Sequence, residues 1–333
     1  MNNNRISKFH FVPVAAALAL AVLTACGAAA SGSGEGDTAV AAASTSAASS
    51  SGYSTTASGL KKAKWGKNIK LTYSSSSVKL SSDGLPNHSR LAQYAVPKNG
   101  GGGQGAITAA NAVIADDPAK AQTTAFSITT KPKKISKTTA APLGSIGMMI
   151  SGAVLFNPYE GDGTTVAAAS NFYLTASDGT KVPFIDDCSG HSTPAMGNGG
   201  GQYHYHALPS CVAAETDTKS GPSRIIGIAL DGFPIYGNRD IKGKKVSVSK
   251  LDKCNGITSA TPEYPKGIYH YVLPGTSDKT SSIRCFHGKV DASQIQPMPP
   301  MGGGPPPGGG PPPATVTASA AKRLICKLLD LGL

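Results

Sequence analysis

Residues 202–211 read QYHYHALPSC, and a related stretch, IYHYVLP, occupies residues 268–274. Each Tyr-His-Tyr triplet follows a Cys-x-Gly motif at the same interval: the spacing from Cys188 to His204 equals that from Cys254 to His270. A proline and a second cysteine follow each triplet. Two units with matched spacing predict an internal duplication.

The alternation of side chains along a strand would place the histidines of the first unit together. If residues 203–206 form a strand, His204 and His206 share one face, while Tyr203 and Tyr205 share the other. Two imidazoles on one face can chelate Zn²⁺, Cu²⁺ or Fe²⁺. The sequence therefore indicates a zinc or copper cofactor held by His204 and His206.

A third ligand could come from another histidine or an acid of the predicted domain. His191 and His88 are the candidate metal ligands, and Asp187 or Asp231 could supply a carboxylate. The same two acids are the candidate catalytic groups, because a His beside a carboxylate can act as a general base. A structural alternative stays open, in which alternating Tyr and His build a hydrogen-bonded surface without metal.

The cysteines around the triplets are expected to form disulfides, provided that the chain folds outside the cytoplasm. The simplest connectivity joins Cys188 to Cys211 and Cys254 to Cys285, while cross-pairing between the units stays open. Zinc ligation by thiolates is disfavoured, because the chain contains no CxxC motif. Cys326 has no assigned partner.

Composition favours a mainly β protein. The 333 residues include 40 Gly and 24 Pro, and only 15% are charged, which suits strands and turns better than helical bundles or coiled coils. We expect a disulfide-stapled, sandwich-like β-rich domain with few short helices. The best helix candidate is the segment 106–115. Short β-type runs cover residues 68–73, 126–128, 146–156, 171–174, 182–185 and 224–230.

The N-terminus has the features of an export signal. Arg5 and Lys8 precede an apolar core that is too short to span a bilayer, so residues 1–25 are predicted to be a signal peptide. The residues around Cys26 resemble a bacterial lipobox, which implies lipidation of that cysteine and, because Gly27 follows it, transfer to the outer membrane. Cleavage after Ala25 without lipidation, giving a secreted protein, is the alternative.

Low-complexity segments flank the predicted domain. Residues 26–59 are expected to form a disordered tether, since nearly every position from 27 to 59 holds Ala, Gly, Ser or Thr. Residues 296–333 form a Pro/Gly-rich tail that ends in a short segment with apolar residues at helical spacing. The folded unit is therefore predicted to span residues 60–295.

Positive charge is concentrated in one part of that unit. Residues 60–140 contain 13 Lys or Arg and three acids, whereas residues 141–295 contain 13 of each. This imbalance indicates either contact with an anionic envelope polymer or a solvated basic surface. Nucleic acid is not an expected partner, because no aromatic residues alternate with the basic ones in the way that stacks bases.

Several rare strings in one order resemble the YHYH-domain family of exported proteins. They are residues 83–88 (DGLPNH), 145–157, 201–206 (GQYHYH), 231–237 (DGFPIYG), 254–256, 269–271 and Cys285. The resemblance covers roughly residues 66–313 and supports the domain assignment more than any function. Val272 stands where the family often has a second His of the closing motif, which argues against a second equivalent metal site.

Three functions remain open. A metal-binding module needs a closed or soft-ligand site, and a metal-dependent hydrolase needs an open coordination position in a cleft with an acid nearby. A structural or adhesive envelope protein needs neither, and its histidines would be buried and hydrogen-bonded away from any pocket.

Overall fold

The computed structural model describes residues 55–98, 106–194 and 200–295. The predicted signal peptide, Cys26, most of the tether, the Pro/Gly tail and Cys326 lie outside these ranges. Among the described residues, no helix has the length and apolarity needed to cross a bilayer. Thr56, which precedes residue 60, packs into the described fold: it is buried and its backbone N–H donates to the carbonyl of Thr130.

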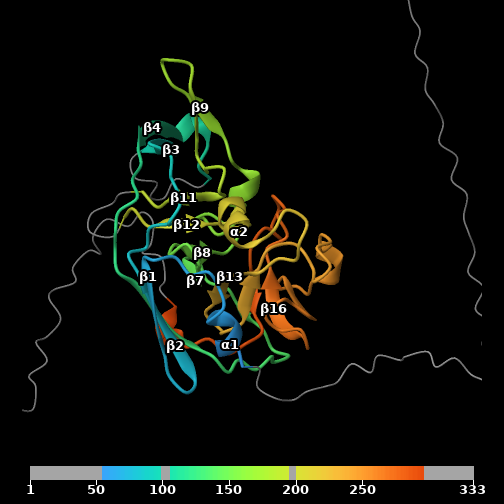
Figure 1. The fold of residues 1–333 in the computed structure, drawn as a ribbon. Coiled ribbons are helices and arrows are strands. Elements are labelled where there is room, and N and C mark those ends of the chain that lie inside the picture. The colour runs from blue at the N-terminus through green and yellow to red at the C-terminus, as the bar shows by residue number, and fades with distance from the viewer. Residues whose placement is uncertain (1–54, 99–105, 195–199, 296–333) are drawn as a thin grey trace, which may run out of the picture. The chain divides into compact units, whose positions relative to one another are not determined.

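An eight-stranded mixed sheet lies at the centre of the described fold (Figure 1). Its strands are β7 (Ser145–Met149), β8 (Val154–Phe156), β11 (Gly190–Ser192), β12 (Tyr203–Tyr205), β13 (Ile225–Ala229), β14 (Pro234–Tyr236), β15 (Gly256–Ser259) and β16 (Ile268–Val272). Their spatial order is β11-β12-β8-β7-β13-β14-β16-β15. The β12–β8 and β14–β16 pairs are parallel, and the other pairs are antiparallel.

The central sheet consists of two equivalent halves. The β7–β8 hairpin matches the β13–β14 hairpin, with IGMMISGAVLFNPY at 146–159 against IGIALDGFPIYGNR at 226–239. Both hairpins turn through a glycine with positive φ, Gly152 at 97° and Gly232 at 91°. Because glycine has no Cβ, it adopts this conformation without steric cost.

The Tyr-His-Tyr strands complete each half in the same register. His191 pairs with His204 across β11 and β12, and Ile257 pairs with His270 across β15 and β16. The interval between the two triplets is shorter than the interval between the two hairpins. The reason is an additional hairpin of β9 (Tyr173–Thr175) and β10 (Lys181–Pro183), which lies between β8 and the triplet of the first half. The predicted internal duplication is confirmed.

The structure contains the disulfides Cys188–Cys211 and Cys254–Cys285. An aspartate that closely precedes the first cysteine of each pair organises the local turn. Asp186 accepts hydrogen bonds from two backbone N–H groups and the Tyr203 hydroxyl, and Asp252 does the same with the Tyr269 hydroxyl. The two disulfide bonds confirm the simplest predicted connectivity.

A three-stranded sheet packs on the same hydrophobic core. It comprises β1 (Ile69–Tyr73), β2 (Ser77–Ser82) and β5 (Thr124–Thr129) in the order β1-β2-β5. Its alternate residues Val78, Leu80, Phe126 and Ile128 are buried in one cluster with side chains of β7 and β13. Two sheets around one core agree with the expected sandwich-like, mainly β fold.

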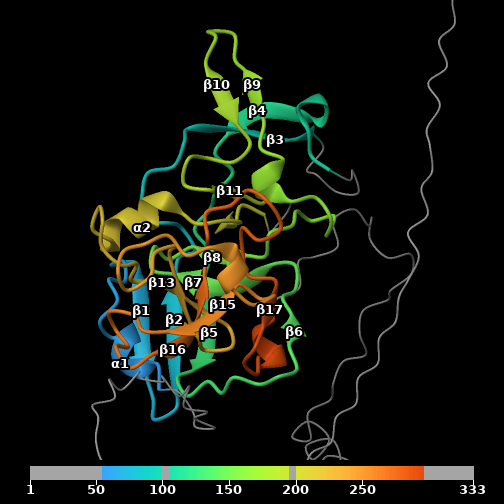
Figure 2. The same cartoon turned by 90° about the vertical axis from the view of Figure 1, so that its right-hand side faces the viewer.

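Small elements complete the described fold. The strands β3 (Gln93–Pro97) and β4 (Ala112–Asp116) pair with each other, next to the β9–β10 hairpin (Figure 2). The short strand β6 (Thr139–Ala140) pairs with β17 (Cys285–Phe286). The helical elements are α1 (Ala57–Leu60), α2 (Ser210–Thr216) and the 3₁₀ turns Ala109–Asn111, Ala167–Ala169, Val248–Lys250 and Ala292–Gln294.

The helix expected at residues 106–115 is wrong. A 3₁₀ turn over Ala109–Asn111 leads directly into β4. The β-branched Val113 and Ile114 favour extended backbone, and pairing with β3 satisfies their backbone hydrogen bonds. Tertiary pairing thus overrides a weak local preference supplied mainly by alanines.

Candidate metal centre

Three histidines meet in the first half of the central sheet. His191 lies on β11 opposite His204 on β12, and His206 directly follows β12. Ring centroids are 4.6 Å apart for His191 and His204, 4.8 Å for His204 and His206, and 5.3 Å for His191 and His206. The sheet therefore assembles three imidazoles from two adjacent strands.

The hydrogen bonds of His204 and His206 fix which nitrogen carries the proton. Nδ1 of His204 lies 3.0 Å from the carbonyl oxygen of Gln202, and Nδ1 of His206 lies 2.7 Å from that of Asn157. A carbonyl oxygen only accepts, so Nδ1 is the donor in each neutral ring and Nε2 is left with a bare lone pair. The two Nε2 atoms lie 3.0 Å apart.

Two lone pairs at this distance repel unless a cation or a proton lies between them. Burial opposes the proton: it lowers the pKa of His206 to about 4 and the pKa of His204 well below its ordinary value. Both rings are therefore neutral near pH 7. A metal ion held by the two Nε2 atoms fits this arrangement, because metal-bound histidines usually donate their other N–H to a carbonyl or carboxylate.

His191 supplies a third imidazole to the cluster. Its side chain is buried, and neither Nδ1 nor Nε2 has a hydrogen-bond partner among the described residues. Burial and the two neighbouring histidines lower the pKa of His191 well below its ordinary value. One ligand nitrogen from each of the three rings lies within 4.8 Å of the others. Tetrahedral zinc places its ligand atoms about 3.3 Å apart, so small side-chain rotations would close the site.

Aromatic packing helps to bury the three histidines. The Phe156 ring stacks on His204 with centroids 3.9 Å apart and meets His206 edge-on at 5.8 Å. The Phe184 ring meets His191 edge-on at 4.5 Å. The low-dielectric surroundings penalise imidazolium and strengthen any interaction of the neutral rings with a cation.

A largely buried carboxylate, Glu160, lies beside His191. Its Oε1 is 3.8 Å from Nε2 of His191 and has no hydrogen-bond partner in the described part of the chain. Burial, aided by the negative charge of Asp162, raises the pKa of Glu160 to about 8. Sequence reasoning misses this residue, because it belongs to a turn after β8 and meets His191 only in the folded protein.

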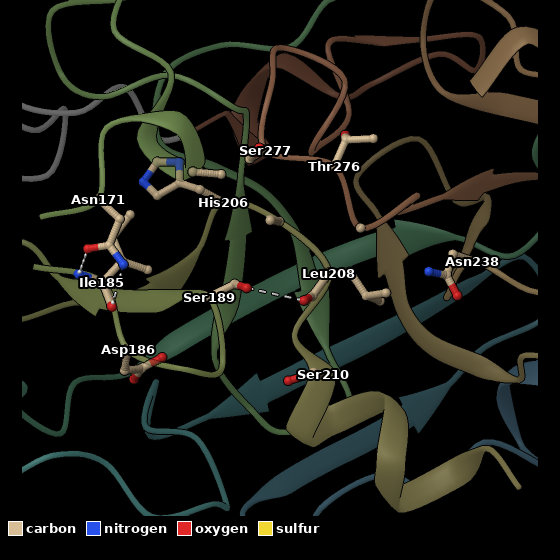
Figure 3. A pocket seen from close by; sticks show the side chains of 13 residues that line it. Asn171, Ile185, Asp186, Ser189, His206, Leu208, Ser210, Asn238, Thr276 and Ser277 are labelled. Carbon is tan, nitrogen blue, oxygen red and sulfur yellow. Dashed lines mark hydrogen bonds between the residues drawn. The ribbon is translucent and has the colours of Figure 1, made fainter. Parts of the chain in front are cut away.

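His206 also borders a cavity of about 450 Å³ (Figure 3). Polar residues on the cavity wall are already engaged: Asn171 pairs with the backbone of Ile185, and the Ser189 hydroxyl donates to the carbonyl of Leu208. Figure 3 shows His206 and Asn238 on opposite sides of the space. The histidine cluster thus has one member at the wall of a cavity.

The structure places His88 away from the three histidines. Its Nε2 lies 2.7 Å from the Tyr205 hydroxyl, which belongs to the opposite face of β12, and 3.4 Å from Sγ of Cys188. Cys188 is engaged in a disulfide and offers no thiolate. His88 is therefore not brought to the cluster, and its contacts are those of a hydrogen-bonded histidine on the tyrosine face.

The two candidate acids also lie elsewhere. Asp187 is exposed, while its neighbour Asp186 is buried and bound to tyrosines. Asp231 is buried in the second half, where it accepts from the Tyr271 hydroxyl at 2.6 Å and from the Gly288 N–H at 2.8 Å. Neither carboxylate takes part in the histidine cluster.

The second half of the sheet provides an internal comparison. His270 repeats the environment of His204, with Nδ1 3.0 Å from the carbonyl of Ile268 and its ring against Tyr236. The positions of His191 and His206 are taken by Ile257 and Val272, both on equivalent strands. This half forms the same strands without three histidines, so the fold does not require the cluster.

A family model for the YHYH protein matches residues 125–245 and 239–288. The chain belongs to the YHYH protein family. The matched ranges include both halves of the central sheet and both disulfides. No curated protein and no solved structure matches the chain.

Proposed function

We propose that this YHYH protein binds one transition-metal ion through His191, His204 and His206. The facing Nε2 atoms of His204 and His206, 3.0 Å apart with both Nδ1 atoms directed at carbonyls, carry the proposal. Neutral, buried imidazoles suit zinc or copper, and three imidazoles match the tetrahedral coordination that zinc prefers.

Elemental analysis of the full exported chain tests this. Wild type, purified from an oxidising compartment without a histidine tag, is expected to hold about one equivalent of zinc or copper, and His204→Ala/His206→Ala none. His270→Ala is the matched control, since it removes the equivalent of His204 from the second half, and it is expected to retain the metal. A wild type that holds no metal after incubation with each ion would favour the structural or adhesive alternative.

A second variant separates metal loss from unfolding. His191→Ile/His206→Val installs the residues that the second half uses at these positions. Because Ile257 and Val272 pack well in the same strand geometry, the variant is expected to fold and to lose the metal. Near-UV circular dichroism and metal content measure the two effects, and a folded variant with full metal content would refute the assignment.

Metal-dependent hydrolysis is a second candidate function, favoured by the cavity at His206. It requires a coordination position open to this space, where a metal-bound water could attack an ester or phosphoester. Activated p-nitrophenyl esters and phosphates are suitable probes. Turnover that depends on metal and disappears in His206→Val would support hydrolysis, and its absence with metal bound would leave binding alone.

We also propose an envelope location for this site. The signal-like N-terminus and the lipobox-like residues before Cys26 support attachment to a membrane through an N-terminal lipid. The two disulfides agree with folding in an oxidising compartment. Metal binding would then occur outside the cytoplasm.

A further inference from the structure

Glu160 is a largely buried acid that has no lysine or arginine partner within the described fold. Its side chain is 11% exposed, and within the described ranges no lysine or arginine forms an ion pair with it. Ionising a buried carboxyl group without a nearby cation is costly, so a cation bound beside Glu160 would favour its carboxylate form. The atom that lacks a hydrogen-bond partner, Oε1, is also the one that approaches Nε2 of His191.

The equivalent residue in the second half behaves differently. Asp240 lies in the matching turn after β14 and accepts backbone N–H bonds from Lys242 and Lys244. It is partly exposed, and no cluster of three histidines lies in the described part of its half. The turn therefore accommodates an acid that simply caps backbone amides, whereas in the first half the acid points at a histidine.

We propose that Glu160 is the fourth ligand of the metal centre, which rests on the proposed function and gives a site of three imidazoles and one carboxylate. The 3.8 Å between Oε1 and Nε2 of His191 is close to the ligand spacing of about 3.3 Å around tetrahedral zinc. Glu160 lies outside the group of three imidazoles that are within 4.8 Å of one another, so its side chain must rotate toward His204 and His206 to reach the ion. The Nε2 atom of His191 then joins those of His204 and His206, so all three imidazoles present the same nitrogen to the ion.

This ligand set defines the class of ion and the chemistry of the site. A carboxylate with three imidazoles favours divalent ions such as Zn²⁺ and Co²⁺, whereas Cu⁺ is selected by thiolate and thioether ligands. Four protein ligands also close a tetrahedral shell, as in structural zinc sites, and leave no position for a reactive water. Glu160 thus makes the centre a binding site for a divalent ion and argues against hydrolysis.

Cobalt substitution of the full chain tests the proposal, because Co²⁺ reports its coordination in the visible spectrum. Wild type is expected to bind one Co²⁺ with an intense tetrahedral spectrum. Glu160→Gln is expected to change that spectrum and to weaken Zn²⁺ binding about 100-fold or more, since even outer-shell partners of a metal contribute roughly 10–100-fold. Asp240→Asn is the matched control and is expected to behave like wild type.

The outcomes separate this proposal from the one on which it rests. Failure of wild type to bind any ion would refute the metal site itself. Metal binding by wild type together with an unchanged Co²⁺ spectrum in Glu160→Gln would refute only the role of Glu160, whatever the change in affinity. If that variant does not fold, azide added to Co²⁺-loaded wild type decides: no spectral change is expected for a closed shell, and a change would show a water at the fourth position.

Discussion

At the residue scale, two tyrosines at equivalent positions of the two halves have hydroxyl groups with different hydrogen-bond partners. The Tyr205 hydroxyl lies 2.9 Å from the Ser151 hydroxyl, and the equivalent Tyr271 hydroxyl donates to Asp231 at 2.6 Å. Serine is neutral, but Asp231 carries a carboxyl group into the core. Burial raises the pKa of Asp231 to about 6, although hydrogen bonds from Tyr271 and from backbone N–H groups lower it in part.

Asp231 is therefore predicted to make stability depend on pH. The pKa of Asp231 is higher in the folded state than in the unfolded chain, so folding favours its protonated form. The contribution of this protonated form to stability is complete below about pH 4 and is lost as pH rises through 6. Asp231→Asn removes this titration. The difference in free energy of unfolding between Asp231→Asn and wild type should therefore shift in favour of the variant by up to about 3 kcal/mol between pH 4 and pH 7. Urea unfolding at several pH values measures this difference, and a constant difference would contradict it.

At the element scale, the second half of the central sheet repeats the strands of the proposed metal site but lacks two of its three histidines. His270 already lies where His204 lies in the first half, and Ile257 and Val272 occupy the positions of His191 and His206 in the same register. Ile257→His together with Val272→His is predicted to create a second metal site. Zinc content should rise from about one to about two equivalents, with weaker binding at the new site because Asp240 is turned to backbone amides.

The single substitution Ile257→His is the control for that experiment, since two imidazoles from one strand pair hold zinc weakly. Circular dichroism must show that the double variant keeps its β structure. A folded double variant with only one equivalent of zinc would mean that three histidines on this scaffold are insufficient, and that contacts outside the strands determine binding in the first half.

Some features of these elements can be predicted from the sequence, and others cannot. The repeat of the Tyr-His-Tyr units, the cysteine pairs and the common face of His204 and His206 follow from spacing and from strand alternation. The repeat of the hairpins is less visible, because few residues besides the glycines are identical between the halves. Glu160, the separation of His88 from the cluster and the strand at residues 112–116 depend on long-range packing, which no local pattern encodes.

At the scale of the whole molecule, part of the excess positive charge lies on exposed lysines near α1, β1 and β2. Exposed lysines follow α1 and continue onto β1 and β2: Lys61, Lys62, Lys64, Lys67, Lys70 and Lys79. If this surface contacts an anionic envelope polymer, binding of the purified protein to a phosphate-rich polymer should weaken strongly between about 0.1 and 1 M salt, as the Debye length falls from about 10 to 3 Å. Binding that is unaffected by salt would exclude an electrostatic contact.

The N-terminal lipid and this basic surface would act together. A single weak attachment gives reversible membrane binding, whereas two signals give stable anchoring. Cys26→Ser removes the lipid and leaves the lysines in place, so the protein is predicted to move from the membrane fraction to the soluble fraction, with a residual bound part that high salt releases. Cell fractionation with metabolic labelling by palmitate measures both effects. A Cys26→Ser protein that stays membrane-bound in high salt, or a wild type that incorporates no lipid, would contradict the lipoprotein assignment and leave simple secretion in its place.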